Sequence, residues 1–433
     1  MISVKIREWN KISAEERAFV LRRAELDITE YTGIAREISD DVRQNGDSAV
    51  LKYTAKFDGV TVPADRIKVT AEEIERGYNN LDKEIRAAIE YAAKNIKNFH
   101  EKQLPEEMWF TEVDKGLMVG EKTTPIVDVC LYVPRGKGSF PSVLLMLGIP
   151  AIAAGVPKIR VTTPPNENGD IDDAILAAAK IIGITDIYKA GGIQAVAAAA
   201  FGTETIPKSH KIIGPGNAYV TAAKRVLSSY IDVGLPAGPS EAIILCDEHA
   251  APHKAALDWM IEAEHGPDSA SLLVTHSREL IDKVIPIVES QYSKLSEKRR
   301  QFIKTNLDTY GGVILTDSLE QSIEFVNEYA PEHMEVMTAQ PFDILPMIKN
   351  AGEILLGEHT PVTLCNYLLG PNAILPTGGF AKTYSSVSVF DFLKRSSIGY
   401  ASKAGFEAVR RHADVFASSE GFEAHALAVR ERK

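Results

Sequence analysis

The sequence has few cysteines, and no two of them have the spacing of a metal or redox motif. The three cysteines, Cys130, Cys246 and Cys365, lie far apart in the chain. A disulfide framework or a zinc site built from thiolates is therefore not expected. Each thiol is interpreted instead as a small buried apolar side chain.

The chain also lacks long apolar runs and an excess of positive charge. No stretch has the length and hydrophobicity needed to span a bilayer, and residues 1–8 lack the apolar core of a signal peptide. We therefore expect a cytoplasmic protein that does not associate with membranes. The net charge is −11 at pH 7, and the sequence contains no extended cluster of basic residues. Because binding to nucleic acid depends on clustered cations, no nucleic-acid partner is expected.

The pattern of apolar residues that is present predicts an α/β fold. Of the 433 residues, 45% are hydrophobic and 25% charged, as in a globular protein of two or three domains. Residues 14–93 have a helical pattern, and the pattern is helical again from residue 390 to the C-terminus. Between them, strands and helices alternate. The expected strands are 126–133, 159–163, 187–189 and 211–213 in a first series, and 242–245, 272–275, 312–315 and 354–356 in a second. Such alternation indicates parallel sheets covered by helices on both faces.

A corner that carries Glu332 and His333 is the first candidate for chemistry. A helical pattern over residues 319–329 stops at Pro331, and a short apolar alternation through residues 334–336 follows. Ligand sites gather at strand ends of α/β sheets, and a carboxylate beside an imidazole can move protons near neutral pH. A surface loop with two polar residues is the simpler alternative.

Two glycine-bearing turns could approach a nucleotide. Residues 190–194 and 214–218 each follow an expected strand and open an expected helix, where backbone donors and the helix dipole favour phosphate. Neither turn completes the Gly-x-Gly-x-x-Gly fingerprint, and glycine is common at such turns for steric reasons alone. A nucleotide site and a purely structural role both remain open.

Metal binding is the third candidate chemistry. Glu262 and His265 lie three residues apart near the end of a helix expected at 252–265, so both side chains project from one face. Oxygen and imidazole donors suit zinc or a similar ion, although an ordinary helix end has the same pattern. The last helical segment carries Glu420 and His425 among apolar residues. Packing against a second copy of the chain would bury that apolar face.

Ordered motifs along nearly the whole chain resemble those of the histidinol dehydrogenase family. They are Tyr132-Val133-Pro134, Gly191-Gly192-Ile193-Gln194-Ala195, Gly214-Pro215-Gly216-Asn217, Ala237-Gly238-Pro239-Ser240-Glu241, Ala263-Glu264-His265, Ala330-Pro331-Glu332-His333 and Asp391-Phe392-Leu393-Lys394-Arg395. The resemblance implies a homodimeric enzyme that depends on NAD and zinc and oxidises a small primary alcohol to a carboxylate in two steps.

The resemblance also implies an organisation into two large domains that resemble incomplete Rossmann units. We expect residues 1–25 to form an N-terminal helical segment and residues 132–240 the NAD-binding domain. Residues 26–131 and 241–388 are expected to form a discontinuous α/β domain with the catalytic and metal residues. Residues 389–433 are expected to form a helical tail that is exchanged between the two subunits.

Roles carried over from the family fall on four groups of residues. Tyr132, Gln194 and Asn217 match cofactor contacts; Ser240, Glu420 and His333 match substrate contacts; Glu332 and His333 match the acid-base pair; and Glu262, His265, Asn366 and His425 match the zinc ligands. In this scheme His333 removes the hydroxyl proton in the first oxidation, and Glu332 helps water add to the bound aldehyde in the second.

Several positions depart from the family pattern. Glu262 stands where the family usually has glutamine, and Asn366 stands where it usually has aspartate, so one carboxylate and one carboxamide remain. Ala373 replaces a histidine that contacts substrate, and Arg135 adds a cation after Tyr132-Val133-Pro134. Histidinol therefore remains one candidate substrate. Alternatives are an activity similar to sulfopropanediol dehydrogenase and a binding protein that has lost catalysis.

Overall fold

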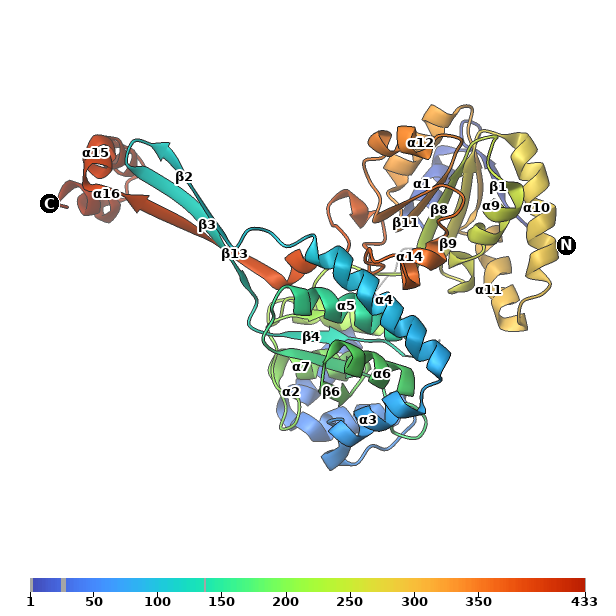
Figure 1. Cartoon of the computed structure of the whole chain (residues 1–433), viewed down its shortest axis with the longest axis horizontal. Helices are drawn as coiled ribbons and strands as arrows, with labels where there is room; N and C mark the ends of the chain where they lie inside the picture. Colours follow the sequence, from blue (N-terminus) through green and yellow to red (C-terminus); the bar gives the residue numbers. More distant parts are fainter. Residues whose placement is uncertain (1–2, 25–28, 136–137, 433) are drawn as a thin grey trace. The chain divides into compact units, whose positions relative to one another are not determined.

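The computed structural model describes residues 3–24, 29–135 and 138–432, which form two compact units. The first unit comprises Met1–Gln103 and Val127–Asp391, and the second comprises Leu104–Ile126 and Phe392–Lys433 (Figure 1). Among the described residues, no helix combines the length and the apolar character that crossing a membrane would require.

A six-stranded parallel sheet forms one half of the first unit. Its strand order is β1-β10-β9-β8-β11-β12. The strands are β1 (Ile6–Glu8), β8 (Glu241–Cys246), β9 (Ala270–Thr275), β10 (Gly312–Leu315), β11 (His333–Met337) and β12 (Glu353–Leu356). Every residue of β8, β9 and β11 is buried, as expected for a parallel sheet covered on both faces. The second series of predicted strands is therefore confirmed. The sheet also contains the edge strand β1, and β11, which takes in the apolar alternation at residues 334–336.

Helices cover both faces of this sheet because alternate strand residues point to opposite sides. Helices α9 (Pro252–Trp259), α10 (Arg278–Tyr292) and α11 (Glu297–Asp308) share one hydrophobic cluster with Ile244 and Leu273. Helices α1 (Ala14–Arg22) and α12 (Leu319–Tyr329) share the opposite cluster with Ile243, Leu245 and Leu272. The shorter α13 (Pro341–Ile344) and α14 (Val362–Tyr367) follow β11 and β12 in the chain. Both faces of the sheet thus carry a packed core.

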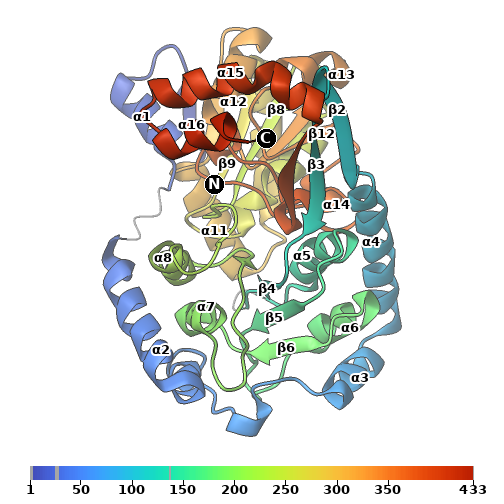
Figure 2. The ribbon, with the colours of Figure 1, turned by 90° about the vertical axis from the view of Figure 1, so that its left-hand side faces the viewer.

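A four-stranded parallel sheet with order β6-β5-β4-β7 forms the other half. Its strands are β4 (Val129–Tyr132), β5 (Ile159–Thr163), β6 (Asp186–Lys189) and β7 (Ile212–Ile213), linked by α5 (Pro141–Ala153), α6 (Asp173–Ile182) and α7 (Gly192–Phe201), with α8 (Ala218–Leu227) after β7. Figure 2 shows α7 and α8 on one side of the strands and α5 and α6 on the other. The first series of strands is confirmed as well.

The long helical region before β4 packs on this four-stranded sheet. Helix α2 (Thr29–Phe57) places Ile38 and Val42 in one hydrophobic cluster with residues of α7 and α8, while α3 (Ala71–Asn80) and α4 (Lys83–Glu101) pack on α5 and α6 (Figure 2). The expected grouping of residues 26–131 with 241–388 differs from this packing. The helical pattern identifies an apolar face but does not identify the sheet that the face covers.

The second unit is a three-stranded antiparallel sheet followed by two helices. Strand β3 (Leu117–Pro125) pairs with β2 (Met108–Asp114) and β13 (Leu393–Ala401), and α15 (Lys403–Ser419) and α16 (Glu423–Arg430) follow. The helical pattern expected from residue 390 is wrong for β13. Most of its side chains are exposed, so it shows no apolar alternation, and its pairing with β3 fixes it as a strand.

The packing of α2 leads to a stability prediction. Ile38 is 1% exposed, and truncating such a side chain leaves a cavity that costs about 2–5 kcal/mol. Ile38→Ala should therefore lower the midpoint of denaturant unfolding, followed by circular dichroism. The neighbouring exposed Glu37 provides a control, because Glu37→Ala should change stability by less than about 0.5 kcal/mol. Equal effects of the two substitutions would contradict the packing of α2.

Candidate active site

The residues predicted to bind NAD lie at the carboxyl ends of strands in the four-stranded sheet. Tyr132 is the last residue of β4, and Asn217 follows β7, which is the neighbour of β4. The chain adds β5 and β6 on one side of β4 and then places β7 on the other side. This reversal creates a switch point, where open parallel sheets bind ligands.

The local geometry there fits a nucleotide. The Tyr132 hydroxyl accepts a hydrogen bond from the Gly192 backbone N–H at 3.1 Å. Gln194 is 1% exposed, yet neither its side-chain nitrogen nor its oxygen has a hydrogen-bonding partner within the described residues. A buried amide without partners costs about 1–3 kcal/mol, which a bound polar ligand could offset. Asn217 caps α8 by accepting a bond from Val220 N–H at 3.2 Å, so a helix N-terminus opens beside it.

In the second glycine turn, the backbone of Gly214 lies close to the backbone of β4. Gly214 has a φ of 136°, and a Cβ atom there would lie 2.1 Å from the Tyr132 carbonyl oxygen. No other residue type fits this position without moving β4. The packing of this turn against β4 is therefore sufficient to explain the glycine, and no bound ligand is needed to account for it.

The acid-base corner is formed by the junction of α12 and β11. Helix α12 ends at Tyr329, Ala330 adopts a left-handed conformation with φ 54°, and His333 is the first residue of β11. Glu332 and His333 therefore lie at the amino edge of the six-stranded sheet. Ser240, just before β8, lies at the same edge because β8 and β11 are parallel neighbours.

Glu332 and His333 are both buried, with exposures of 8% and 3%. Glu332 Oε1 lies 3.7 Å from His333 Nε2, and Glu353 Oε1 lies 2.5 Å from His333 Nδ1. Burial raises the pKa of Glu332 to about 8, although the neighbouring His333 lowers it. Burial alone would lower the pKa of His333, but Glu332, Glu353 and Glu262 together raise it to about 10. The corner can therefore hold and transfer protons.

A buried network fixes the Glu332 side chain. The Glu241 backbone N–H donates to Glu332 Oε2 at 2.9 Å, and Glu241 Oε1 accepts from the Gly378 N–H at 2.6 Å. Glu241 Oε2 lies 3.4 Å from the Nε of Arg23, which is also buried. Arg23 in turn lies over the Tyr329 ring, 3.8 Å from its centroid, and donates to the Tyr329 carbonyl.

The predicted metal ligands of the first unit converge, although the helix expected at 252–265 ends earlier. Helix α9 stops at Trp259, and Glu262 lies in a separate 3-10 turn, Glu262–Glu264, in which residues three apart are aligned. Glu262 is fully buried. Its Oε2 lies 2.8 Å from His265 Nδ1, and its Oε1 lies 3.4 Å from Asn366 Nδ2.

This cluster fits a divalent cation. Among the described residues no group of three or more His, Cys, Asp or Glu side chains is arranged to hold a metal, so a site here needs Asn366 as a donor. The two ends of an amide are interchangeable in a hydrogen-bonding assignment, and rotation would present the Asn366 oxygen in place of its nitrogen. Burial opposes ionisation of Glu262, but His265 and His333 hold its pKa at about 2. Ser240 Oγ lies 3.1 Å from His265 Nδ1, which connects this cluster to the Glu332 corner.

Two predicted site residues belong to the second unit. Glu420 is the residue that ends α15, and His425 lies on α16, with its ring centroid 5.2 Å from that of Phe422. Both side chains are exposed. The structure thus brings together Glu262, His265 and Asn366, whereas Glu420 and His425 stand on a separate unit.

Other sequence interpretations can also be compared with the structure. All three cysteines are buried and free, as predicted. Burial raises the pKa of the Cys365 thiol, which disfavours a thiolate ligand beside Asn366. The guanidinium Nε of Arg135 lies 3.1 Å from Asp172 Oδ2, so its charge is already paired. Glu353, Arg23 and Glu241 were not predicted as site residues, since their contacts arise from strand register and from chain segments far apart in sequence.

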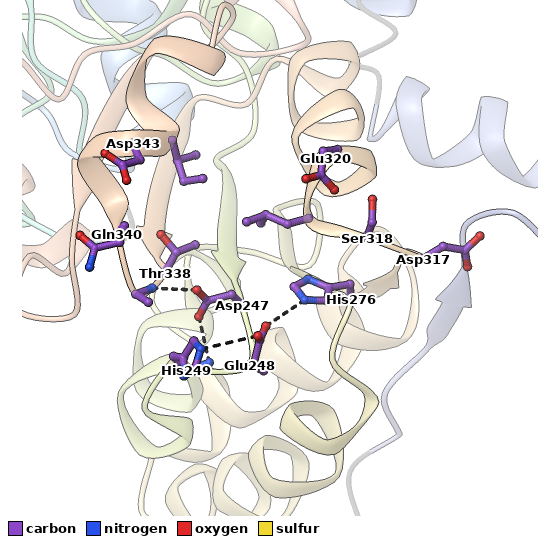
Figure 3. A pocket seen from close by; sticks show the side chains of 13 residues that line it. Asp247, Glu248, His249, His276, Asp317, Ser318, Glu320, Thr338, Gln340 and Asp343 are labelled. Atoms are coloured by element: carbon purple, nitrogen blue, oxygen red, sulfur yellow. Dashed lines mark hydrogen bonds and ion pairs between the residues drawn. The ribbon is translucent and has the colours of Figure 1, made fainter.

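A separate cavity of about 570 Å³ lies at the opposite, carboxyl edge of the six-stranded sheet (Figure 3). Several of its polar groups are paired with one another. Asp247 accepts bonds from the backbone N–H groups of His249 and Ala339, and Glu248 lies 2.9 Å from His276. None of the predicted site residues lines it. The candidate active site is therefore defined by the convergence of reactive groups at the amino edge rather than by the size of this cavity.

Comparisons with known proteins agree with this arrangement. The family model described as histidinol dehydrogenase matches residues 21–433. The chain is 47% identical over 429 residues to a histidinol dehydrogenase of Synechocystis sp., with 99% of each protein covered. It is also 47% identical to a histidinol dehydrogenase homolog of Rhizobium meliloti, covering 99% of this chain and 94% of that protein.

A solved structure gives the same result. The crystal structure of histidinol dehydrogenase from Elizabethkingia anophelis superposes with a TM-score of 0.92 at 35% identity, covering 99% of this chain and 98% of that one. The chain therefore belongs to the histidinol dehydrogenase family and is an NAD-dependent dehydrogenase.

Proposed function

We propose that the protein oxidises a small primary alcohol to a carboxylate through a bound aldehyde, in two NAD-dependent steps. The observation that carries the proposal is the buried Glu332–His333 pair, held beside the Glu262–His265–Asn366 cluster through Ser240 and Glu241. A buried acid-base pair next to a cluster of potential metal ligands suits the oxidation of an alcohol, because the pair can take the hydroxyl proton and a metal can polarise the oxygen.

The two buried side chains of the corner have separate tasks. His333 accepts the hydroxyl proton at Nε2 while the substrate loses its first hydride. Glu332 then takes a proton from the water that adds to the aldehyde. Its burial and raised pKa support this task, because a carboxyl group poised near neutral pH can both accept and return a proton.

Both proton transfers depend on a bound cofactor and a bound metal ion, which residues of this protein would hold. Tyr132, Gln194 and Asn217 would hold NAD; Glu262, His265 and Asn366, with His425 as a fourth ligand, would hold Zn²⁺. NAD would accept the hydrides, and Zn²⁺ would bind and polarise the substrate oxygen. Ser240 and Glu420 would contact the substrate.

We propose further that the active unit is a homodimer in which a second copy supplies His425 and Glu420. The second unit has almost no core: its buried residues are Gly120, Phe392, Gly405 and Ala426 within the described chain. Its large exposed apolar side chains include Met108, Trp109, Phe110, Val113, Met118, Tyr400, Val415, Phe416, Phe422 and Leu427. So much apolar surface on a unit without a core supports burial against a partner.

Three positions, Ser240, Glu420 and Ala373, bear on the identity of the alcohol. Histidinol fits the retained Ser240 and Glu420, whereas Ala373 lacks the polar side chain that the family pattern places there. The pairing of Arg135 with Asp172 weakens the argument for an anionic substrate of the sulfopropanediol type. Retention of Glu332 and His333 in a buried pair disfavours a binding protein without catalysis, because such a protein has no need of the pair.

The first prediction separates the two oxidations. Glu332→Gln should slow conversion of aldehyde to acid by about 100-fold to 10,000-fold, while the first hydride transfer stays fast, because only the second step needs a base for water. Single-turnover measurements of NADH with histidinol and with sulfopropanediol would detect a fast first NADH and a slow second one. Glu328→Gln, at an exposed position on α12, the helix that precedes the corner, is the control. Equal slowing of both steps would assign Glu332 a positioning role only.

The second prediction concerns the metal cluster. Protein purified without chelator should contain one divalent metal per subunit, measured by elemental analysis. Glu262→Ala should lose the metal because it removes a buried carboxylate ligand. Glu264→Ala alters the same 3-10 turn at a more exposed position, 40% for the side chain, and should keep the metal. Equal metal content in both variants would exclude Glu262 as a ligand.

The third prediction tests whether the site is shared between two copies. Chains carrying Glu262→Ala and chains carrying His425→Ala should each be inactive alone. Unfolding and refolding them together should restore about a quarter of wild-type activity, because half of the dimers are mixed and each mixed dimer has one complete site of two. Light scattering should show a dimer throughout. An inactive mixture that contains mixed dimers would place His425 in the site of its own chain.

A further inference from the structure

Glu353 and His333 occupy equivalent positions on neighbouring strands. They are the first residues of β12 and β11, and they are directly opposite each other in the parallel register. The backbone on both sides is fixed by hydrogen bonds, from Gly352 N–H to the Pro331 carbonyl at 2.9 Å and from Glu353 N–H to the Glu332 carbonyl at 3.0 Å. The two side chains therefore project to the same side of the sheet from a rigid frame.

The side chains meet in a buried contact. Glu353 Oε1 lies 2.5 Å from His333 Nδ1, and the two residues are 8% and 3% exposed. A short contact that excludes water orients an imidazole strongly, because the ring cannot rotate without breaking the bond. The other ring nitrogen of His333, Nε2, then faces Glu332, and its distance from Glu332 Oε1 is 3.7 Å.

We propose that Glu353 is a positioning residue that fixes the tautomer and orientation of His333; this inference rests on the proposed function. A carboxylate can only accept a hydrogen bond, so Nδ1 of His333 carries a proton in both charge states of the ring, and in the neutral ring that accepts the substrate proton Nε2 presents the lone pair. When Nε2 takes the hydroxyl proton, the O–H bond breaks, a new N–H bond forms, and the hydride leaves for NAD. Glu353 gains and loses no proton; its charge stabilises the imidazolium.

This assignment differs from a purely structural role for Glu353. A structural residue would affect folding and would be replaceable by any side chain that fills the same volume. A positioning carboxylate is sensitive to its charge, because a carboxamide of the same shape can donate to Nδ1 and stabilise the other tautomer. Glu353→Gln therefore distinguishes the two roles, while Glu353→Asp keeps the charge and shortens the side chain.

The decisive experiment measures activity and the state of His333 separately. In the wild type, a low-field proton resonance should arise from the Nδ1–H of His333, and His333→Gln should remove it to confirm the assignment. Glu353→Gln should also remove it and should lower kcat by about 100-fold to 10,000-fold, with KM, metal content and unfolding temperature nearly unchanged. Glu353→Asp should recover part of kcat. Glu358→Gln, at an exposed position beyond the carboxyl end of β12, should leave kcat unchanged.

Two results would overturn the inference. One is a Glu353→Gln enzyme whose kcat remains within threefold of the wild type. The other is an equal loss of kcat in Glu353→Gln and Glu353→Asp together with a lowered unfolding temperature, which marks a structural role. The resonance is recorded without substrate or NAD, and wild-type turnover is measured independently. A wild type that oxidises no alcohol would therefore reject the proposed function, and a missing resonance would reject the contact.

Discussion

The geometry of the acid-base corner depends on Glu241, a buried carboxylate with three partners. Its backbone N–H holds Glu332, its side chain accepts from Gly378 N–H, and Arg23 lies close enough to compensate its charge. Burial raises the pKa of Glu241, and Arg23 opposes that shift. Removing one member of such a buried pair typically costs about 3–5 kcal/mol, because the other charge is left without compensation. The charges of Glu241 and Arg23 thus stabilise the corner without having to contact the substrate.

The two parallel sheets use opposite edges for their candidate sites. The four-stranded sheet presents Tyr132 and Asn217 at its carboxyl edge, where the strand order reverses and a helix begins. The six-stranded sheet presents Ser240 and His333 at its amino edge, next to the strands β8 and β11 where its own order reverses. The general rule for open α/β sheets therefore applies only to the residues proposed to bind the cofactor. The residues proposed for catalysis depend on a corner and on buried charge instead.

The sequence was sufficient for features that depend on local pattern, and insufficient for those that depend on distant pairing. Apolar runs predicted most strands of both parallel sheets, though not the edge strand β1, and Pro331 predicted the corner before β11. The sheet beneath α2 could not be predicted, because an apolar helix face is compatible with either sheet. Strand β13 has mostly exposed side chains, so its pairing with β3 left no signal. Glu353 became visible as a partner of His333 only through the register of β11 and β12.

Charge balance links the unusual metal cluster to the rest of the site. Glu262 and Asn366 stand where the family pattern has a carboxamide and a carboxylate, and their side chains lie 3.4 Å apart. Two carboxylates at that distance would repel each other in a buried site, whereas a carboxylate and a carboxamide attract. A carboxylate in place of the carboxamide at position 262 thus favours a carboxamide in place of the carboxylate at position 366. The paired change keeps one negative charge and one neutral oxygen donor beside His265, which is the donor set that we propose for a divalent cation.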